Sequence, residues 1–161
     1  MQQILILVFG LFLIEQACFL SEVFSSGSNR RELEGRTLNA FSMFKAGIRP
    51  EWEDPANSLG SELNCRKTMI VQEVDHHWEN MVLACIGEIV DENDEICGCR
   101  VVDKTKRGGG GSTRQIFRLE LWLRSRNEEV ADRIKNRLIE ALTDGDKKGG
   151  NKLSFDLNKR V

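Results

Sequence analysis

Residues 115–124 have the sequence QIFRLELWLR, in which side chains of two kinds alternate. A period of two is typical of a β-strand with one face in a protein core. One face would carry Phe117, Leu119 and Leu121, and the other Arg118, Glu120 and Trp122. The first face can pack beneath helices, and the second presents a basic residue and an aromatic ring to the open side of a sheet.

Other strands are expected on both sides of this segment. Residues 96–104 form a strand-like run, and the glycine-rich segment 108–112 separates it from 115–124. Glycine-rich connections favour antiparallel pairing, so the two runs are predicted to form a long hairpin. Residues 63–74 are expected to hold one or two short strands, and residues 153–157 a last strand.

Two helices are predicted from apolar residues at helical spacing. The first has Asp75 as its expected N-cap, and the second has Asn127. Their apolar faces would carry Trp78, Met81, Val82, Cys85, Ile86 and Ile89 in the first helix, and Val130, Ile134, Leu138 and Leu142 in the second. The order of elements predicts an α+β fold, with helices on one face of an antiparallel sheet.

The composition is that of an ordinary globular domain. The chain has 161 residues, of which 40% are hydrophobic and 30% charged, and its net charge of −2 neither favours nor excludes nucleic acid. Its five cysteines do not make a zinc-ligand set with the histidines, so no metal or other cofactor is expected. The pattern favours buried, reduced thiols of the cytosol over a disulfide framework.

The N-terminal region has three interpretations. Residues 4–14 are continuously apolar, which suits a signal peptide, a buried strand or helix, or a sequence foreign to the natural protein start. We expect a divergent segment at 1–37 and the main domain at 38–161. The expected location is cytoplasmic without membrane association, and the alternative is secretory if residues 1–26 are a signal peptide.

A loop at 44–57 has the sequence FKAGIRPEWEDPAN and contains both prolines of the chain. Each proline disfavours helix at the preceding residue, so Trp52 and Glu53 are expected on a stiff, extended turn. An aromatic plane beside a carboxylate can bind a flat, cationic ligand with N–H donors. The alternative interpretation makes Trp52 a core residue and Glu53 a solvated acid.

Basic residues cluster around the predicted hairpin. Between positions 100 and 126 the eight basic residues Arg100, Lys104, Lys106, Arg107, Arg114, Arg118, Arg124 and Arg126 are opposed only by Asp103 and Glu120. Phosphate is the natural partner of such a cluster, although basic residues also keep sheet edges soluble. A site for a planar cation and a site for phosphate together indicate a nucleotide.

The loop motif Phe44-Lys45-x-Gly47-Ile48-x-Pro50-x-Trp52-Glu53-Asp54-x-x-Asn57 resembles that of the translation initiation factor 4E family, which binds the mRNA cap. Further matches occur in order at Trp78, 86–88, 94–98, Trp122 and 127–130, so the resemblance covers about residues 38–142. It implies a curved antiparallel sheet with helices on the convex face and the cap in the concave front. It also implies a non-enzymatic recognition protein.

The resemblance implies a role for six residues. Trp52 would stack on the 7-methylguanine base, Glu53 would accept its N1–H and N2–H groups, and Trp122 would lie beside the methyl group. The triphosphate of capped mRNA would be bound by Lys104 and Arg118, with Lys106 as a weaker candidate.

The chain departs from the family pattern at several positions. No tryptophan precedes Trp52 to complete the base sandwich, and Glu62 stands where the family carries a basic residue. A scaffold initiation factor or an inhibitory binding protein would dock on the convex face. Glu79 and Asn80 replace the Leu-Glu pair used there, and Leu20 is the best match to a missing tryptophan.

Two alternative functions follow from these departures and from the histidine pair. The first is a divergent family member with weak or no cap binding that acts as a regulatory or interaction protein. The second is an enzyme using Asp75, His76 and His77 with Glu79, but on a helix these residues do not share one face. We therefore expect no enzyme activity.

Overall fold

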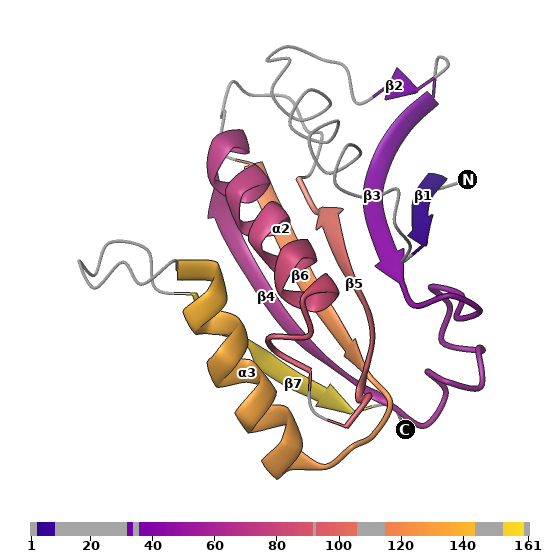
Figure 1. Ribbon diagram of the computed structural model, residues 1–161. Coiled ribbons are helices and arrows are strands. Elements are labelled where there is room, and N and C mark those ends of the chain that lie inside the picture. The colour runs from indigo at the N-terminus through magenta and orange to yellow at the C-terminus, as the bar shows by residue number, and fades with distance from the viewer. Residues whose placement is uncertain are drawn as a thin grey trace.

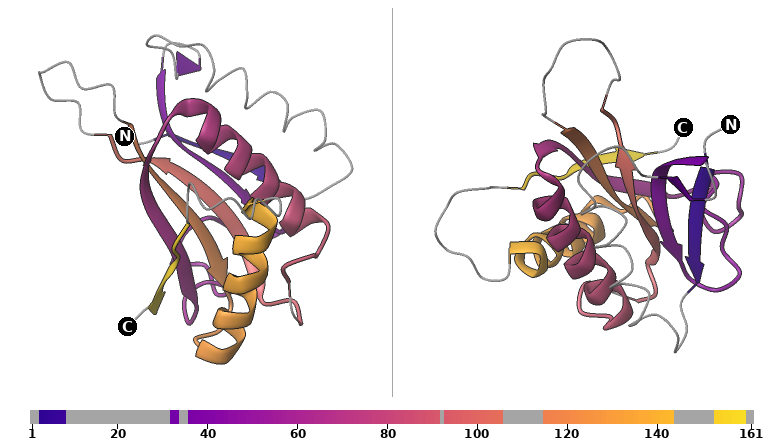
Figure 2. Two further views of the ribbon diagram at one scale, coloured as in Figure 1. Left: turned by 90° about the vertical axis from the view of Figure 1, so that its left-hand side faces the viewer. Right: turned by 90° about the horizontal axis from the view of Figure 1, so that it is seen from above.

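The computed structural model describes residues 3–8, 32–33, 36–91, 93–105, 115–143 and 153–159. The elements in chain order are β1 (Gln3–Val8), β2 (Glu32–Leu33), β3 (Arg36–Phe44), β4 (Ser61–Met69), α2 (Val71–Ile86), β5 (Ile96–Asp103), β6 (Gln115–Leu123), α3 (Glu128–Thr143) and β7 (Asp156–Lys159). The described strands form one sheet in the order β1-β3-β5-β6-β4-β7, with β2 beside β3. Both helices lie on one face of this curved sheet (Figures 1 and 2). The predicted α+β class is confirmed.

Strand pairing is antiparallel from β3 to β7, whereas β1 runs parallel to β3. The predicted hairpin of β5 and β6 is confirmed, with Val101 opposite Leu119 and Arg100 opposite Glu120. The glycine-rich segment predicted at its tip lies outside the described residues. In the N-terminal region, for which three interpretations were given, Gln3–Val8 form a strand.

The hydrophobic core lies between the sheet and the two helices. Alternate residues of β6 enter it as predicted, and Phe117, Leu119 and Leu121 are all fully buried. The helices contribute a face from α2 and a face from α3 to the same core, including Trp78, Met81, Ile134 and Leu138. We call the opposite face of the sheet, which carries Arg118, Glu120 and Trp122, the front face.

Helix α2 begins four residues before its predicted N-cap. Val71 to Val74 were expected to be strand, but β4 ends at Met69 and the helix starts at Val71. The Glu73 carboxylate accepts a hydrogen bond from the Ile70 N–H at 3.0 Å, which satisfies a backbone donor at the helix start. Asp75 therefore lies inside the helix, and its prediction as an N-cap is wrong.

The end of α2 also differs from the prediction. Trp78, Met81, Val82 and Cys85 are buried as expected. Ile86 and Ile89 are 38% and 65% exposed, since Ile86 is the last residue of the helix and Ile89 lies in the turn after it, and Val90 is the next residue that is buried in the core. In contrast, the Asn127 cap of α3 is confirmed, since its side-chain oxygen accepts hydrogen bonds from the N–H groups of Glu129 and Val130. The predicted apolar face of α3 is buried at Ile134, Leu138 and Leu142.

The cysteines of the described residues are buried free thiols, at Cys65, Cys85, Cys97 and Cys99. Burial raises the pKa of Cys97 to about 11 and also raises that of Cys65, which keeps these thiols protonated and unreactive. Neither described helix has the length and apolar character that crossing a lipid bilayer requires.

We predict that Asp75→Asn stabilises the protein at pH 8 and has little effect near pH 4.5. Asp75 is buried and its Oδ1 atom has no hydrogen-bond partner. Burial, reinforced by the Glu79 carboxylate, raises the pKa of Asp75 from 3.8 to about 7. Between these values the folded state holds a proton that the unfolded state has lost, so the wild-type free energy of unfolding falls as pH rises. Thermal unfolding of both proteins at the two pH values measures the effect, and equal shifts in Tm at both would contradict it.

Candidate functional site

Trp52 and Trp122 stack directly on one another on the front face. Their ring centroids are 3.6 Å apart and their planes differ by 14°. Trp122 is fully buried on β6, whereas Trp52 is half-buried in the loop that follows β3. A flat ligand between the two rings would need a separation of about 7 Å, twice a carbon–carbon contact distance. The two indoles are therefore in a closed arrangement.

Trp122 is fixed by contacts on two sides. The Phe44 ring meets it edge-on at a centroid distance of 5.2 Å and an angle of 84°. Its indole Nε1–H donates a hydrogen bond of 3.0 Å to the Glu120 carboxylate, which has no exposed surface. A neutral donor and an aromatic edge thus define one orientation of the indole.

Gly98 permits this contact between Phe44 and Trp122. It lies between them in the sheet, opposite Phe44 on β3 and Trp122 on β6. A Cβ atom at Gly98 would approach the Met43 carbonyl oxygen and Phe44 Cγ to 2.5 Å, which is too close for any side chain. The pairing of β5 with β6 is irregular just before this glycine, at Ile96/Gly98, and Cys97 joins the aromatic cluster there.

The loop that carries Trp52 is a succession of tight turns rather than the extended segment predicted. The Asp54 carboxylate accepts hydrogen bonds from the N–H groups of Arg49 and Ala56, both at 3.0 Å. The buried Asn57 side chain donates to the carbonyl groups of Arg49 and Glu51, both at 2.8 Å. These two side chains bend the backbone back on itself, as short polar side chains commonly do in turns. The backbone N–H donors also lower the pKa of Asp54.

Lys45 connects this loop to the acidic turn before β5. Its Nζ atom lies 2.6 Å from Asp91 and 2.7 Å from Asp94. Although burial opposes the shift, these hydrogen bonds raise the pKa of Lys45. Arg124, two residues after Trp122, also pairs with Asp94 at 3.2 Å. Ion pairs therefore connect the acidic turn to the chain next to Phe44 and to the chain next to Trp122.

The predicted phosphate-binding residues lie on the same face. Arg118 is two residues from Glu120 on β6, and its Nε–H donates a hydrogen bond of 2.6 Å to the Glu120 carboxylate. Lys104 directly follows β5, and its N–H donates to the Ile116 carbonyl group at 2.8 Å. Burial and the nearby Arg118 charge lower the pKa of Lys104. Lys106 lies outside the described residues.

Glu53 lies beside Trp52 in the loop and is exposed. Within the described residues it has no hydrogen bond or ion pair, so its carboxylate is available to a ligand. The structure therefore brings together Trp52, Trp122, Arg118 and Lys104 on one face, with Glu53 at its margin.

The family model for eukaryotic initiation factor 4E matches residues 23–160, most of the chain. The chain belongs to the eukaryotic initiation factor 4E family. Eukaryotic translation initiation factor 4E1 of Drosophila melanogaster is 32% identical over 122 residues, which are 74% of this chain and 42% of the relative. The chain thus spans less than half the length of that relative.

Solved structures of initiation factor 4E proteins have the same fold. The Ascaris suum eIF4E-3 complex with m7G cap matches 92% of this chain and 74% of its own, with a TM-score of 0.65 and 24% identity. A schistosome eIF4E complexed with m7GpppA and 4E-BP matches 89% of this chain and 70% of its own, with a TM-score of 0.56 and 26% identity.

Glu120 is the main residue of this candidate site that the sequence did not assign. The sequence placed it on the same strand face as Arg118 and Trp122 and counted it as an acid opposing the basic cluster, but gave it no role; in the structure it binds both residues. The available indication was its position between those two residues on the same face of one strand. Glu62, at the position where the family carries a basic residue, is buried opposite Trp122 on β4.

His77, one of the residues of the alternative enzyme hypothesis, makes a contact between the two helices. His77 is buried, and its Nδ1 atom lies 3.3 Å from the Leu142 carbonyl group, which links α2 to α3. No group of three or more potential metal-ligating His, Cys, Asp or Glu side chains occurs in the described part of the chain.

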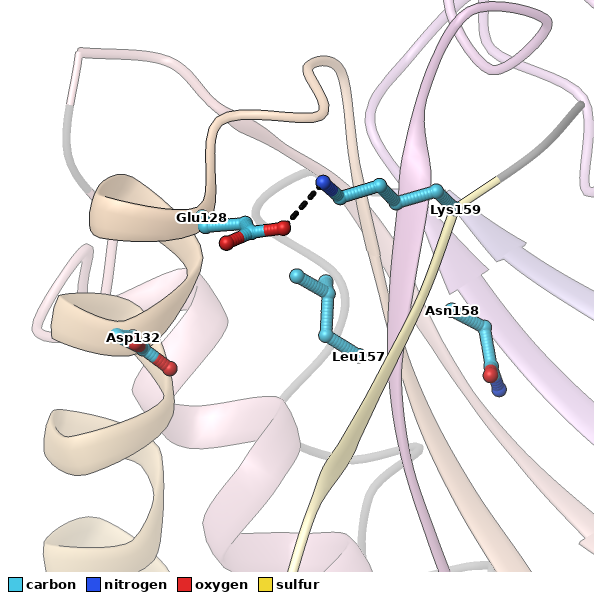
Figure 3. Close-up of a pocket in the computed structure, with 5 residues that line it drawn as sticks. All are labelled: Glu128, Asp132, Leu157, Asn158 and Lys159. Carbon is cyan, nitrogen blue, oxygen red and sulfur yellow. Dashed lines mark hydrogen bonds and ion pairs between the residues drawn. The ribbon is translucent and has the colours of Figure 1, made fainter.

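A separate pocket of about 510 Å³ lies between the start of α3 and β7 (Figure 3). Its lining residues are Glu128, Asp132, Leu157, Asn158 and Lys159. Glu128 and Lys159 form an ion pair across it. None of the five predicted site residues that the structure describes lines this pocket, so it is distinct from the aromatic site.

We predict that Glu120→Gln lowers the free energy of unfolding by about 1.5–3 kcal/mol, the usual cost of losing hydrogen bonds to a charged group. The amide oxygen of glutamine can accept only part of these bonds, and its NH₂ group would face a donor from Arg118 or Trp122. The matched control is Glu128→Gln, which removes an exposed ion pair with Lys159 and should cost less than about 1 kcal/mol. Urea unfolding measures both, and equal losses would show that burial of the Glu120 carboxylate has no special role.

Proposed function

We propose that this chain binds the 7-methylguanosine cap of mRNA as a non-enzymatic recognition module in translation initiation. Family membership and the cap-bound structures of similar proteins support the proposal. The observation that carries it is the stacked Trp52–Trp122 pair on the same face as Arg118 and Lys104. An aromatic platform beside clustered cations suits a base joined to phosphates. The buried free thiols suit a cytoplasmic location.

For cap binding, the base must either enter between the rings of Trp52 and Trp122, which must then separate, or stack on the ring face of Trp52 that is turned away from Trp122. Trp122 is held by Phe44 and by Glu120, whereas Trp52 is half-buried and belongs to a loop. Trp52 is therefore the ring that moves. The 7-methylguanine base stacks on Trp52, either between the two rings or on the face of Trp52 that is turned away from Trp122. The positive charge of the methylated base strengthens its attraction to an indole face.

Charged groups then complete the recognition of the nucleotide. Glu53, exposed next to Trp52, accepts the N1–H and N2–H groups of guanine in a charge-assisted pair. Lys104 and Arg118 bind the phosphates. Arg118 must exchange part of its contact with Glu120 for the phosphate oxygens, which makes its contribution smaller than that of an unpaired arginine.

We predict that the protein is retained on immobilised 7-methyl-GTP and eluted by free 7-methyl-GTP but poorly by GTP. Trp52→Ala should abolish retention, since base stacking contributes about 1–3 kcal/mol. Glu53→Gln should weaken binding at least about tenfold, because one charge-assisted pair is lost. The control is Trp78→Phe, a change in the core behind the sheet, which should leave the affinity unchanged. Equal elution by GTP would exclude specific cap recognition.

A second candidate function is docking of a partner protein on the helical side of the molecule, with weak or no cap binding. The observation that favours it is a group of exposed apolar residues at the end of α2, where Leu83, Ile86 and Ile89 are 52%, 38% and 65% exposed. Large exposed apolar side chains that lie together commonly mark interaction surfaces. The schistosome protein is complexed with 4E-BP, which makes an amphipathic helical segment the partner to test.

We predict that Leu83→Asp weakens binding of a 4E-binding-protein peptide at least about tenfold, because it places a charge on an apolar contact. Leu59→Asp is the matched control, since Leu59 is 72% exposed and belongs to the loop before β4 rather than to α2. Isothermal titration of the peptide into the three proteins measures the affinities. An unchanged affinity in Leu83→Asp would exclude this surface of α2 as the docking site.

A further inference from the structure

Two further arginines extend the cationic cluster of the front face. Arg66 lies on β4 directly opposite Arg118 on β6, and Arg100 lies on β5 directly opposite Glu120. Side chains that face each other across a sheet have Cβ atoms about 4.5–5.5 Å apart. Arg66, Arg100 and Arg118 therefore come from three neighbouring strands and project from one face, next to Lys104.

The positive charge of this cluster is only partly balanced. Glu120 is buried, and Arg118 and the Trp122 indole already occupy its carboxylate. Within the described residues Arg66, Arg100 and Lys104 have no ion pair. The Nε atom of Arg100 is buried without a hydrogen-bond partner.

The surroundings of Lys104 show how close these cations are. Burial lowers the pKa of Lys104, and the charges of Arg118, Arg100 and Arg66 lower it further, whereas Glu120 acts in the opposite direction. Like charges opposite each other in a sheet are destabilising. A bound anion would remove this repulsion and supply the missing partner of Arg100.

The cluster extends away from the aromatic pair along the sheet. Arg100 lies one row of residues beyond Trp122, and Arg66 lies two rows beyond it. At a strand rise of about 3.4 Å per residue, these rows are about 7 and 14 Å from the Trp122 row. Arg118, which the proposed function assigns to the cap phosphates, lies in the same row as Arg66. Arg66 and Arg100 therefore flank the path of the cap phosphates on the two neighbouring strands, where they can also face the phosphates that follow in an RNA chain.

We propose that Arg66 and Arg100 form an additional anion site that binds phosphodiester groups of an RNA chain crossing β5, β6 and β4 from the aromatic pair. This inference rests on the proposed function, and it adds two residues that the resemblance does not assign. The phosphate groups of single-stranded RNA fit the observations because clustered arginines bind them in forked, charge-assisted pairs. Recognition here is independent of sequence, since only the backbone is bound.

The test compares three ligands: 7-methyl-GTP, a short capped oligoribonucleotide and the same oligoribonucleotide without a cap. Binding is measured over a range of salt concentrations for the wild type, Arg66→Gln and Arg100→Gln. Each substitution should weaken binding of both oligoribonucleotides and reduce the slope of log affinity against log salt by about 0.7, the value for one single-strand phosphate contact. Binding of 7-methyl-GTP should weaken less than binding of the capped oligoribonucleotide.

Two control variants separate charge from structure. Arg126→Gln makes the same charge change at an exposed position beyond the other end of β6, and it should leave the salt slope unchanged. Arg100→Lys keeps the positive charge and should keep most of the slope. Thermal unfolding of each variant identifies any loss of fold.

The outcomes are distinct from those of the cap experiment. If the wild type fails to bind 7-methyl-GTP, cap binding is wrong, and the uncapped oligoribonucleotide still decides on the anion site. Equal losses for 7-methyl-GTP and the oligoribonucleotides would assign both arginines to the cap phosphates and overturn the proposal. A slope unchanged from that of Arg126→Gln, or no binding of either oligoribonucleotide, would also overturn it.

Discussion

The alternation of side chains along β6 is the constraint on which the rest of the molecule depends. This strand lies between β5 and β4, so both of its edges are hydrogen-bonded and its side chains can project only to the two faces of the sheet. Its apolar residues hold α2 and α3 against one face, and Arg118, Glu120 and Trp122 occupy the other. A shift of the pairing by one residue would put Trp122 into the core and Leu121 on the front face, which would remove both the core and the site.

The buried carboxylate of Glu120 connects the aromatic and cationic residues of the front face. Glu120 has no exposed surface, and the cost of burying its carboxylate is offset by the guanidinium group of Arg118 and by the hydrogen bond from Trp122. The same contacts fix the orientation of the Trp122 ring, against which Trp52 stacks. Glu120 therefore fixes the positions of Trp122 and Arg118 relative to each other.

The loop that carries Trp52 is constrained differently. Its shape comes from Asp54 and Asn57, which bind backbone groups a few residues away in sequence. Lys45 then joins the loop to Asp91 and Asp94, more than forty residues further along the chain. Local hydrogen bonds give the turn its form, and the long-range ion pairs place it over the sheet. A ring on such a loop can move while the strands beneath it stay fixed.

Features that depend on neighbours in sequence were predictable. The Asn127 cap, the two faces of β6 and the hairpin follow from patterns a few residues long, and the loop motif identified the family. The start of α2 was missed because Val71 and Val74 suit a strand as well as a helix. These residues are helical in the structure because Val74 is fully buried in the core against the sheet. That contact is tertiary, so the local sequence does not reveal it.

The sequence by itself determined the α+β class, the family and the residue types of the site, because periodicity and short motifs carry that information. The tertiary structure alone decided that Trp52 stacks on Trp122, which is 70 positions later in the chain. It also decided that Glu120 is buried between Arg118 and Trp122, and that Arg66 faces Arg118. These relations depend on strand register and on the path of a loop through space, which are set by the packing of the whole sheet and its core.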